Sequence, residues 1–236
     1  MNERRQLDIG EILGRTAETV SSAGRDVAVF VLLIGGLGAL GVALALTTNI
    51  AMEFASDMTA SVPGGLAAAL FDLSLSLVTW IAGFFLMRRY LEASGRQSSG
   101  VAHVWLYLGM SILSFLGLVA GLILLIIPGI ILMVRWSAAS GFLISGEKGV
   151  TQSLGASFEA TKGSGWQIFF AAIILLLGLG VIGAVIGGIF GTLSLTVLIY
   201  VSAFLEAFSN AIFLAFGIAI YLLLSDGNEA VREVFS

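Results

Sequence analysis

The sequence predicts an all-α fold, a polytopic transmembrane helix bundle of about six spans with an N-terminal amphipathic helix. Three observations lead to this prediction. Of the 236 residues, 58% are hydrophobic and only 11% are charged, whereas an ordinary soluble domain is about 25% charged. A soluble protein of this composition would lack polar residues to cover its surface. The apolar residues also form long blocks, and about 20 such residues cross a bilayer core.

Residues 1–26 are predicted to form the N-terminal amphipathic interfacial helix. Asp8 can cap its start, with Glu11 three residues later, as in a capping box. This helix can lie in the membrane interface or pack on the bundle, and Gly24 is the predicted break. An apolar stripe at helical spacing follows the cap, formed by Ile9, Ile12, Leu13, Thr16, Ala17 and Val20.

The six-span membrane domain is predicted at residues 27–224. The first two spans cover about 27–47 and 66–87, with a polar loop at 48–65 between them. Residues 103–145 are almost continuously apolar. A single helix of that length would measure roughly 65 Å, about twice the bilayer core. This block must therefore hold spans three and four.

The turn between spans three and four can lie near Gly117–Gly121 or at Pro128. With the turn at Pro128, Arg135 would lie about 9 Å along the helix from the outer end, which costs roughly 3 kcal/mol unless the charge is paired. With the turn near Gly117–Gly121, Arg135 reaches the interface, and Pro128 with Gly129 becomes a kink inside a helix. We favour the second arrangement because it avoids a buried charge.

Residues 147–165 are predicted to hold a cytoplasmic amphipathic helix. Val150, Leu154 and Phe158 are spaced four apart and would face lipid or protein. Ser153 is expected on the opposite, solvent-facing side, where a charged replacement would be tolerated.

The fifth span covers about 166–190, the sixth lies within 193–224, and 225–236 is a short charged tail. Ten of the 11 Lys and Arg residues then fall on one side of the membrane. The eleventh, Arg135, lies inside an apolar block. Because basic residues concentrate in cytoplasmic segments, both termini are predicted to be cytoplasmic.

Composition limits the possible chemistry. The chain has no cysteine and one histidine, His103, so disulfides, cysteine metal sites and histidine-rich sites are excluded. No long run of one charge suggests nucleic-acid binding. Two G-x-G-x-x-G matches lie inside apolar blocks, where a dinucleotide site has no strand to precede it. We therefore predict no cofactor, no metal site and no catalytic residue.

Glycines recur every four residues in two of the spans. Small residues at this spacing let helices approach closely. The candidate helix-packing residues are Gly117, Gly121, Gly183, Gly187 and Gly191.

Asp72, Arg135 and Glu206 are the ionisable residues well inside the apolar blocks. Charges within a membrane are expensive and mark functional sites. Structural pairing is the alternative, and with the turn at Pro128 we expect Arg135 to pair with Asp72 or Glu206.

Two parts of the sequence carry a recognisable pattern, one at the N-terminus and one around Pro128 and the segment after it. Its residues are Asp8–Leu13, Ile127–Trp136, Glu147, Ser157, Thr161–Gly163, Trp166 and Phe169. This pattern resembles a bacterial six-helix membrane family, which includes the membrane domain of some glycerophosphoryl diester phosphodiesterases and related uncharacterised proteins. The resemblance implies that catalysis in that family resides in a separate soluble barrel of about 250 residues. This chain has no room for such a barrel, so we expect no enzymatic activity.

We therefore expect a non-enzymatic protein of the bacterial inner membrane that supports or organises lipid or envelope processes. The alternatives are a transporter or channel for a small or amphiphilic solute and, less favoured, an intramembrane enzyme. Membrane lipids are the expected partners, together with a membrane protein or a second copy of the chain. A transporter should show a cavity lined by one of the intramembrane charged residues.

Overall fold

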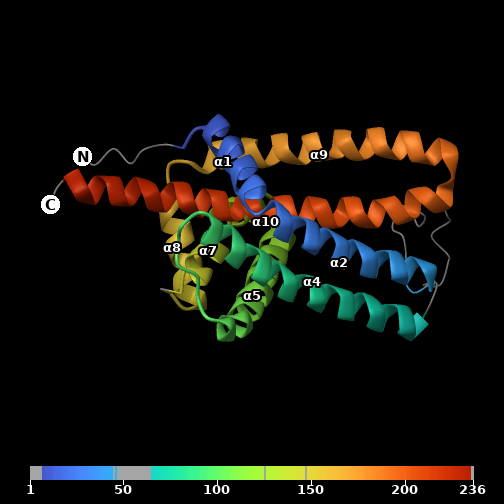
Figure 1. The fold of residues 1–236 in the computed structure, drawn as a ribbon. Coiled ribbons are helices and arrows are strands. Elements are labelled where there is room, and N and C mark those ends of the chain that lie inside the picture. Colours follow the sequence, from blue (N-terminus) through green and yellow to red (C-terminus); the bar gives the residue numbers. More distant parts are fainter. Residues whose placement is uncertain (1–6, 45, 47–64, 125, 147, 235–236) are drawn as a thin grey trace. The chain divides into compact units, whose positions relative to one another are not determined.

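The computed structural model describes residues 7–44, 46, 65–124, 126–146 and 148–234, and every regular element within these ranges is helical (Figure 1). The predicted all-α fold is confirmed. In chain order the helices are α1 (Ile9–Ser22), α2 (Gly24–Ala43), α4 (Gly65–Ala93), the 3-10 helix η1 (Val101–His103), α5 (Val104–Leu124), α6 (Ile126–Arg135), α7 (Ala139–Ile144), α8 (Val150–Ala160), α9 (Gly165–Leu193) and α10 (Leu195–Val234).

Six segments of the described chain are long and apolar enough to cross a membrane, as predicted, so the protein is a multi-pass integral membrane protein. The polar loop predicted at 48–65 lies outside the described residues except for Gly65. The tail predicted at 225–236 continues α10 as far as Val234. The six spans are Gly24–Ala43, Leu66–Ala93, Val101–Ile123, Ile126–Ile144, Gly165–Thr192 and Thr196–Asp226.

The chain forms two compact units, and α4, α9 and α10 each contribute residues to both. Unit 1 contains Met1–Gly24, Phe84–Leu177 and Ile212–Ser236. Unit 2 contains Arg25–Gly83 and Gly178–Ala211.

The core of unit 1 is the second half of α10. From Ala215 to Leu222 every residue is buried, so this segment is covered on all sides. Two glycines allow close contact with this segment, Gly141 on α7 and Gly217 on α10 itself, which faces the turn before α7. A Cβ on Gly141 would lie 2.3 Å from the Tyr221 Cβ, and one on Gly217 would lie 2.9 Å from the Ser137 carbonyl oxygen. Backbone-to-helix contacts this close leave no room for a larger residue.

Helices α5 and α6 form a hairpin within unit 1, in which α5 ends at Leu124 and α6 begins at Ile126. The favoured position of the turn, Gly117–Gly121, is therefore wrong. These glycines lie inside α5, where a Cβ on Gly121 would be 3.1 Å from the Gly129 Cα. Pro128 occupies the first turn of α6 and is not a kink inside a helix, because at that position its missing N–H leaves no helical hydrogen bond unmade.

The fourth span is broken in two. Its first part, α6, ends at Arg135, and its second part, α7, begins at Ala139. The Ser157 hydroxyl donates a hydrogen bond of 2.7 Å to the Arg135 carbonyl oxygen. A side chain of α8 therefore satisfies one of the carbonyls that the end of α6 leaves free.

Helix α8 lies within the predicted range but buries a different side. Leu154 is buried, as expected, and Phe158 is half-buried. Ser153 and Ser157 are fully buried, so the prediction of a solvent-facing Ser153 is wrong. Small hydroxyl residues allow close helix contact and can donate to a neighbouring carbonyl, as Ser157 does, and this outweighs the larger apolar side chains in orienting the helix.

Helix α1 packs on unit 1. Asp8 is its N-cap, and the Asp8 carboxylate accepts a 2.8 Å hydrogen bond from the Gly10 N–H. The buried side carries Ile12, Thr16 and Thr19. Ahead of the helix, the Leu7 N–H donates to the Ser164 hydroxyl at 3.1 Å. The chain then breaks at Ala23, one residue before the predicted glycine, and α2 begins.

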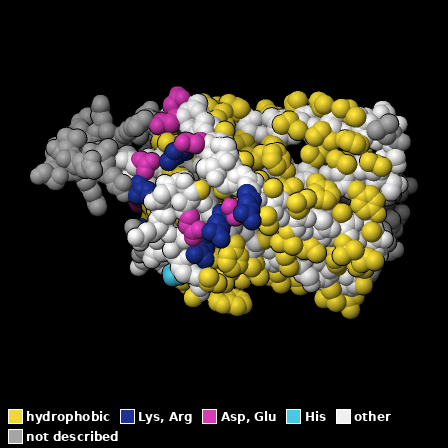
Figure 2. All heavy atoms as spheres, in the orientation of Figure 1, with side chains coloured by type: hydrophobic (Ala, Val, Ile, Leu, Met, Phe, Trp, Pro, Cys, Tyr) yellow, Lys and Arg dark blue, Asp and Glu magenta, His cyan; other side chains and the backbone are white. Residues whose placement is uncertain are grey.

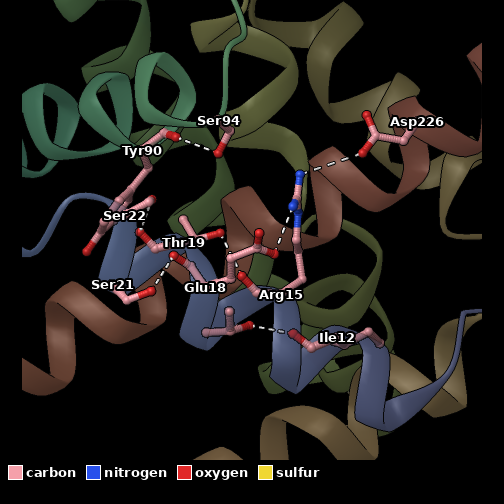
Figure 3. A network of polar contacts seen from close by, with 10 residues as sticks. Ile12, Arg15, Glu18, Thr19, Ser21, Ser22, Tyr90, Ser94 and Asp226 are labelled. Carbon is pink, nitrogen blue, oxygen red and sulfur yellow. Dashed lines mark hydrogen bonds and ion pairs between the residues drawn. The ribbon is translucent and has the colours of Figure 1, made fainter.

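An ionic network ties α1 to the end of α10 in unit 1 (Figure 3). Arg15 lies 2.9 Å from Glu18 and 3.7 Å from Asp226. Asp226 also pairs with Arg96, in the segment after α4. One carboxylate therefore holds two arginines from distant parts of the sequence. On the face shown in Figure 2, the charged side chains gather in one region and hydrophobic side chains cover most of the rest.

Unit 2 consists of α2 from Arg25 onward, the first part of α4, the second part of α9 and the first part of α10. Its close contacts join α2 to α10. A Cβ on Gly35 would lie 2.5 Å from the Phe204 ring, and one on Gly38 would lie 3.2 Å from the Ala203 Cβ. Elsewhere large apolar side chains remain exposed, which suits contact with lipid. Examples are Leu32, Leu66, Leu73 and Val181.

Candidate functional site

A cavity of about 300 Å³ lies within unit 2, between α2, α4 and α10. Residues of α2 and small residues of α10 form its apolar wall, including Ile34 and Ala207. Apart from Leu75 of α4, the remaining lining is polar or aromatic. It consists of Ser76, Thr79 and Trp80 from α4 and of Glu206 and Asn210 from α10.

The helical register brings these polar residues to one place. Glu206 and Asn210 are four residues apart, so they lie on the same face of α10. Ser76 and Trp80 have the same spacing on α4. Asp72 lies one further turn along that face, about 6 Å from Ser76 along the helix axis. It is half-buried and does not line the cavity.

Glu206 lies deep in its span. It follows the first residue of α10 by 11 positions, or about 16 Å of helix. The span that contains it, Thr196–Asp226, is longer than the hydrocarbon core of about 30 Å, and Glu206 lies well inside both ends of that span. Placing a charge inside a span costs about 3 kcal/mol on insertion scales.

The polar groups of the cavity have unused hydrogen-bonding capacity. The Thr79 hydroxyl donates to the Leu75 carbonyl oxygen at 2.8 Å, which leaves its oxygen lone pairs available. Within the described residues, the side chains of Glu206 and Asn210 make no hydrogen bond or ion pair. Polar groups inside a bilayer are normally satisfied by neighbours, so this cavity is set up to receive a polar partner.

The charged residues of unit 2 that lie well inside the spans are acidic. Its one basic residue in the sequence is Arg25, at the start of α2. Ile34, which lines the cavity, is nine residues further on, or about 14 Å of helix. The intramembrane part of the unit holds Asp72 and Glu206 and no lysine, arginine or histidine.

Arg135, the third intramembrane candidate, belongs to unit 1. Its guanidinium lies 5.4 Å from the centre of the Phe158 ring, close enough for a cation–π interaction. One guanidinium nitrogen, Nη1, is buried without a hydrogen-bond partner. No carboxylate of the described chain forms an ion pair with it. Arg135, at the end of α6, therefore contacts α8 through the Phe158 ring.

A second cavity, of about 200 Å³, lies in unit 1 among α5, α6 and α7. Its polar lining is made of hydroxyl groups, from Tyr107, Ser111, Ser114 and Ser140. It contains no carboxylate or basic side chain. This cavity therefore has no charged group with which to distinguish cationic from neutral or anionic ligands, unlike the cavity lined by Glu206.

The candidate glycines have different surroundings. Gly117 lies against the Trp136 ring, since a Cβ there would be 2.6 Å from the ring, and Gly121 lies against Gly129. On α9, a Cβ on Gly183 would meet no atom within 4 Å. The equivalent atoms on Gly187 and Gly191 would lie 3.9 and 3.5 Å from Leu198, which is ordinary contact.

Of the polar and aromatic residues that line the cavity, Glu206 was predicted from the sequence, whereas Ser76, Thr79, Trp80 and Asn210 were not. A signal existed for three of these four, because Asn210 follows Glu206, and Ser76 and Trp80 follow Asp72, at four-residue spacing. Among the described residues, no group of His, Asp or Glu side chains could hold a metal ion. No family model, curated protein or solved structure matches this chain.

Proposed function

We propose that this is a non-enzymatic, multi-pass protein of the bacterial inner membrane that binds a small or amphiphilic solute in the cavity of unit 2. Through that binding it supports lipid or envelope processes. The observation that carries the proposal is Glu206, a carboxylate well inside its span that lines a cavity and has no described partner. Intramembrane charges with these properties mark ligand or ion pathways.

The size and lining of the cavity favour an amphiphile. A volume of about 300 Å³ lies at the lower end of small-molecule sites, so it suits a head group or a small solute. A polar head would meet Glu206 and Asn210, and an apolar tail would lie against exposed side chains of α4 such as Leu73. Such a ligand satisfies the polar lining without exposing its tail to water.

The orientation of the protein is part of the proposal. Both termini and the segment of α8 are placed in the cytoplasm, since ten Lys and Arg residues sort to that side. The resemblance of residues 127–170 to the phosphodiesterase-associated membrane family supports a role in the bacterial envelope.

A second candidate function is transport of the same solute. The observation in its favour is the polar face of α4, where Asp72, Ser76 and Thr79 follow one another along the helix. Polar residues in sequence along one face can line a route for a solute. Uptake of a bound solute into sealed vesicles containing the purified protein would distinguish transport from binding alone.

The binding proposal is tested by filling the cavity. Wild-type protein is purified in lipid nanodiscs, and the amphiphiles that remain bound are identified by native mass spectrometry. Ser76→Trp places a large side chain in the cavity and should remove the bound amphiphile. Ser74→Trp, on the same helix but away from the cavity, is the control and should retain it. Equal retention by the two variants would overturn the proposal.

The orientation is tested with single cysteines, because the natural chain has none. Glu159→Cys in α8 should react with a membrane-impermeant thiol reagent only after the cells are permeabilised. Thr192→Cys, at the end of α9, should react in intact cells. The reverse labelling pattern would overturn the proposed orientation.

A further inference from the structure

We infer that the cavity of unit 2 selects an ammonium head group with N–H donors, carried by an aminolipid or a free organic amine. This inference rests on the proposed function, because it names the class of ligand that the same cavity binds. Its evidence is the charge of the unit, the number of hydrogen-bond acceptors and the aromatic ring in the lining.

The charge of the cavity calls for a cation. A carboxylate removed from water needs an opposite charge or several donors close by. Glu206 makes no hydrogen bond or ion pair within the described residues, and Arg25, the single basic residue of unit 2, lies nine residues before Ile34, the first residue of α2 in the cavity lining. Asp72 adds a second negative charge on the adjoining turn of α4. A bound cation supplies what the chain itself does not.

The acceptors of the cavity match an ammonium group. A primary ammonium has three N–H donors and no acceptor, as in lysine. The cavity offers three kinds of acceptor, namely the Glu206 carboxylate, the Asn210 carbonyl oxygen and the Thr79 oxygen, whose own proton is already donated to Leu75. An inorganic cation of the same charge would use these groups but would leave the apolar wall without contact.

Trp80 adds a reason to prefer an organic cation. A tryptophan ring attracts an ammonium within about 6 Å of its centre, and the attraction grows when the site is shielded from water. The ring also packs against the methylene groups next to the ammonium. A carboxylate and a tryptophan in one cavity therefore recognise both the charge and the carbon attached to it.

Anionic head groups are disfavoured on the same grounds. A phosphate or sulfate would face Glu206 with no lysine, arginine or histidine of unit 2 within the spans to bind it. Like charges at close range repel strongly when little water lies between them. An aminophospholipid can still bind, because its ammonium can enter while its phosphate stays outside.

The test compares two probes with the same tail, dodecylammonium and neutral dodecanol, titrated onto the protein in nanodiscs and quantified by native mass spectrometry. Wild-type protein should bind the ammonium probe at least about tenfold more tightly, as a charge-assisted hydrogen bond implies. Glu206→Gln keeps the size of the side chain and should bring the two affinities within about twofold of one another. An unchanged preference in Glu206→Gln would overturn the inference.

Two controls separate this inference from the proposed function. Asp226→Asn removes a carboxylate of unit 1 and should leave the probe preference unchanged. If both probes bind wild-type protein equally and Ser76→Trp abolishes both, the cavity binds amphiphiles but the ammonium inference fails. If neither probe binds, or if Ser76→Trp and Ser74→Trp bind alike, the proposed function itself fails.

The source of the ammonium is resolved by changing the lipid. If the natural ligand is an aminolipid, nanodiscs of phosphatidylethanolamine should weaken dodecylammonium binding by about tenfold or more relative to phosphatidylglycerol, by competition. If it is a free amine, the two lipids should give the same probe affinity, and water-soluble butylamine should displace the probe. Displacement by neither phosphatidylethanolamine nor butylamine would overturn the inference.

Discussion

Units 1 and 2 differ in whether their carboxylates have ion-pair partners, although three helices contribute residues to both units. In unit 1 the carboxylate of Asp226 is paired with Arg15 and Arg96. In unit 2 the carboxylate of Glu206 lines a cavity and makes no ion pair with a described residue. The contrast is therefore one between carboxylates, since unit 1 also holds a guanidinium nitrogen, on Arg135, that is buried without a hydrogen-bond partner.

Helix α10 shows the same contrast within one element. Its second half, which belongs to unit 1, is buried on every side from Ala215 to Leu222. In its first half, which belongs to unit 2, Ala207 and Ala211 are the residues that are fully buried. Both halves are apolar, so hydropathy does not tell them apart. The two halves differ in how completely their neighbours cover them, because the first half has exposed side chains such as Glu206 and Phe208.

The largest effect is expected from filling a glycine contact in unit 1. Gly141→Leu would force atoms into the Tyr221 side chain, and overpacking of this kind costs from about 1 to 3 kcal/mol or more. We expect little folded protein on fluorescence-detected size-exclusion chromatography. Gly183→Leu, where a Cβ meets no atom within 4 Å, should give the wild-type yield.

The same pair of variants tests the predicted role of Gly183 in helix packing. If α9 contacts a second copy of the chain through this glycine, Gly183→Leu should lower the oligomeric mass without lowering the yield. An equal loss of folded protein in Gly141→Leu and Gly183→Leu would contradict the difference between the units.

The next largest effect is expected in α8. Ser153→Asp would bury a carboxylate at a position with no exposed surface, which costs roughly 3 kcal/mol or more without a partner. Thr151→Asp, on the exposed side of the same helix, is the matched control. The thermal midpoint in detergent should fall for Ser153→Asp alone. Similar midpoints for the two variants would show that α8 is oriented differently.

A change of opposite sign is expected at Glu206. Replacing a carboxylate inside a span that has no described partner should relieve up to about 3 kcal/mol of insertion cost. Glu206→Leu should therefore raise the thermal midpoint while it abolishes binding of the ammonium probe. A lower midpoint, measured in the absence of ligand, would mean that Glu206 stabilises the fold as the paired carboxylates of unit 1 do.

The smallest effect is expected at Asp226. Its side chain is about half exposed, and exposed ion pairs contribute roughly 0.2–1 kcal/mol each. Asp226→Asn should lower the thermal midpoint slightly and speed the proteolysis of α1, which Arg15 anchors. High salt should reduce the difference from wild type. A large, salt-independent loss would contradict a surface ion pair.

The sequence was sufficient to predict the six spans and the capping role of Asp8, because apolar blocks and capping residues act locally. It was not sufficient to predict that α5 ends at Leu124 and α6 begins at Ile126. Pro128 can stand at a kink or in a first turn, and the tertiary contact between Gly121 and Gly129 decides between the two. Ser153 was misplaced for a related reason, since a serine is polar in composition but small enough to pack.

The candidate site was predictable only in part. Glu206 stands out because a charge inside an apolar block is rare. Trp80 and Thr79 do not, because an aromatic ring and a hydroxyl group are common in membrane helices. Their assignment to the cavity depends on α4 and α10 lying on either side of it, which is a tertiary fact.

The hairpin of α5 and α6 has a consequence for biosynthesis. A single residue separates the two helices, and α6 is only 10 residues, about 15 Å, long. A helix that short cannot cross a bilayer alone, and the connection carries no polar loop that could wait outside while the first helix inserts. We therefore expect Val104 to Ile144 to insert together, and the two helices to pair as they leave the insertion machinery. The glycines at the hairpin's contact would then act during synthesis, before the rest of unit 1 exists.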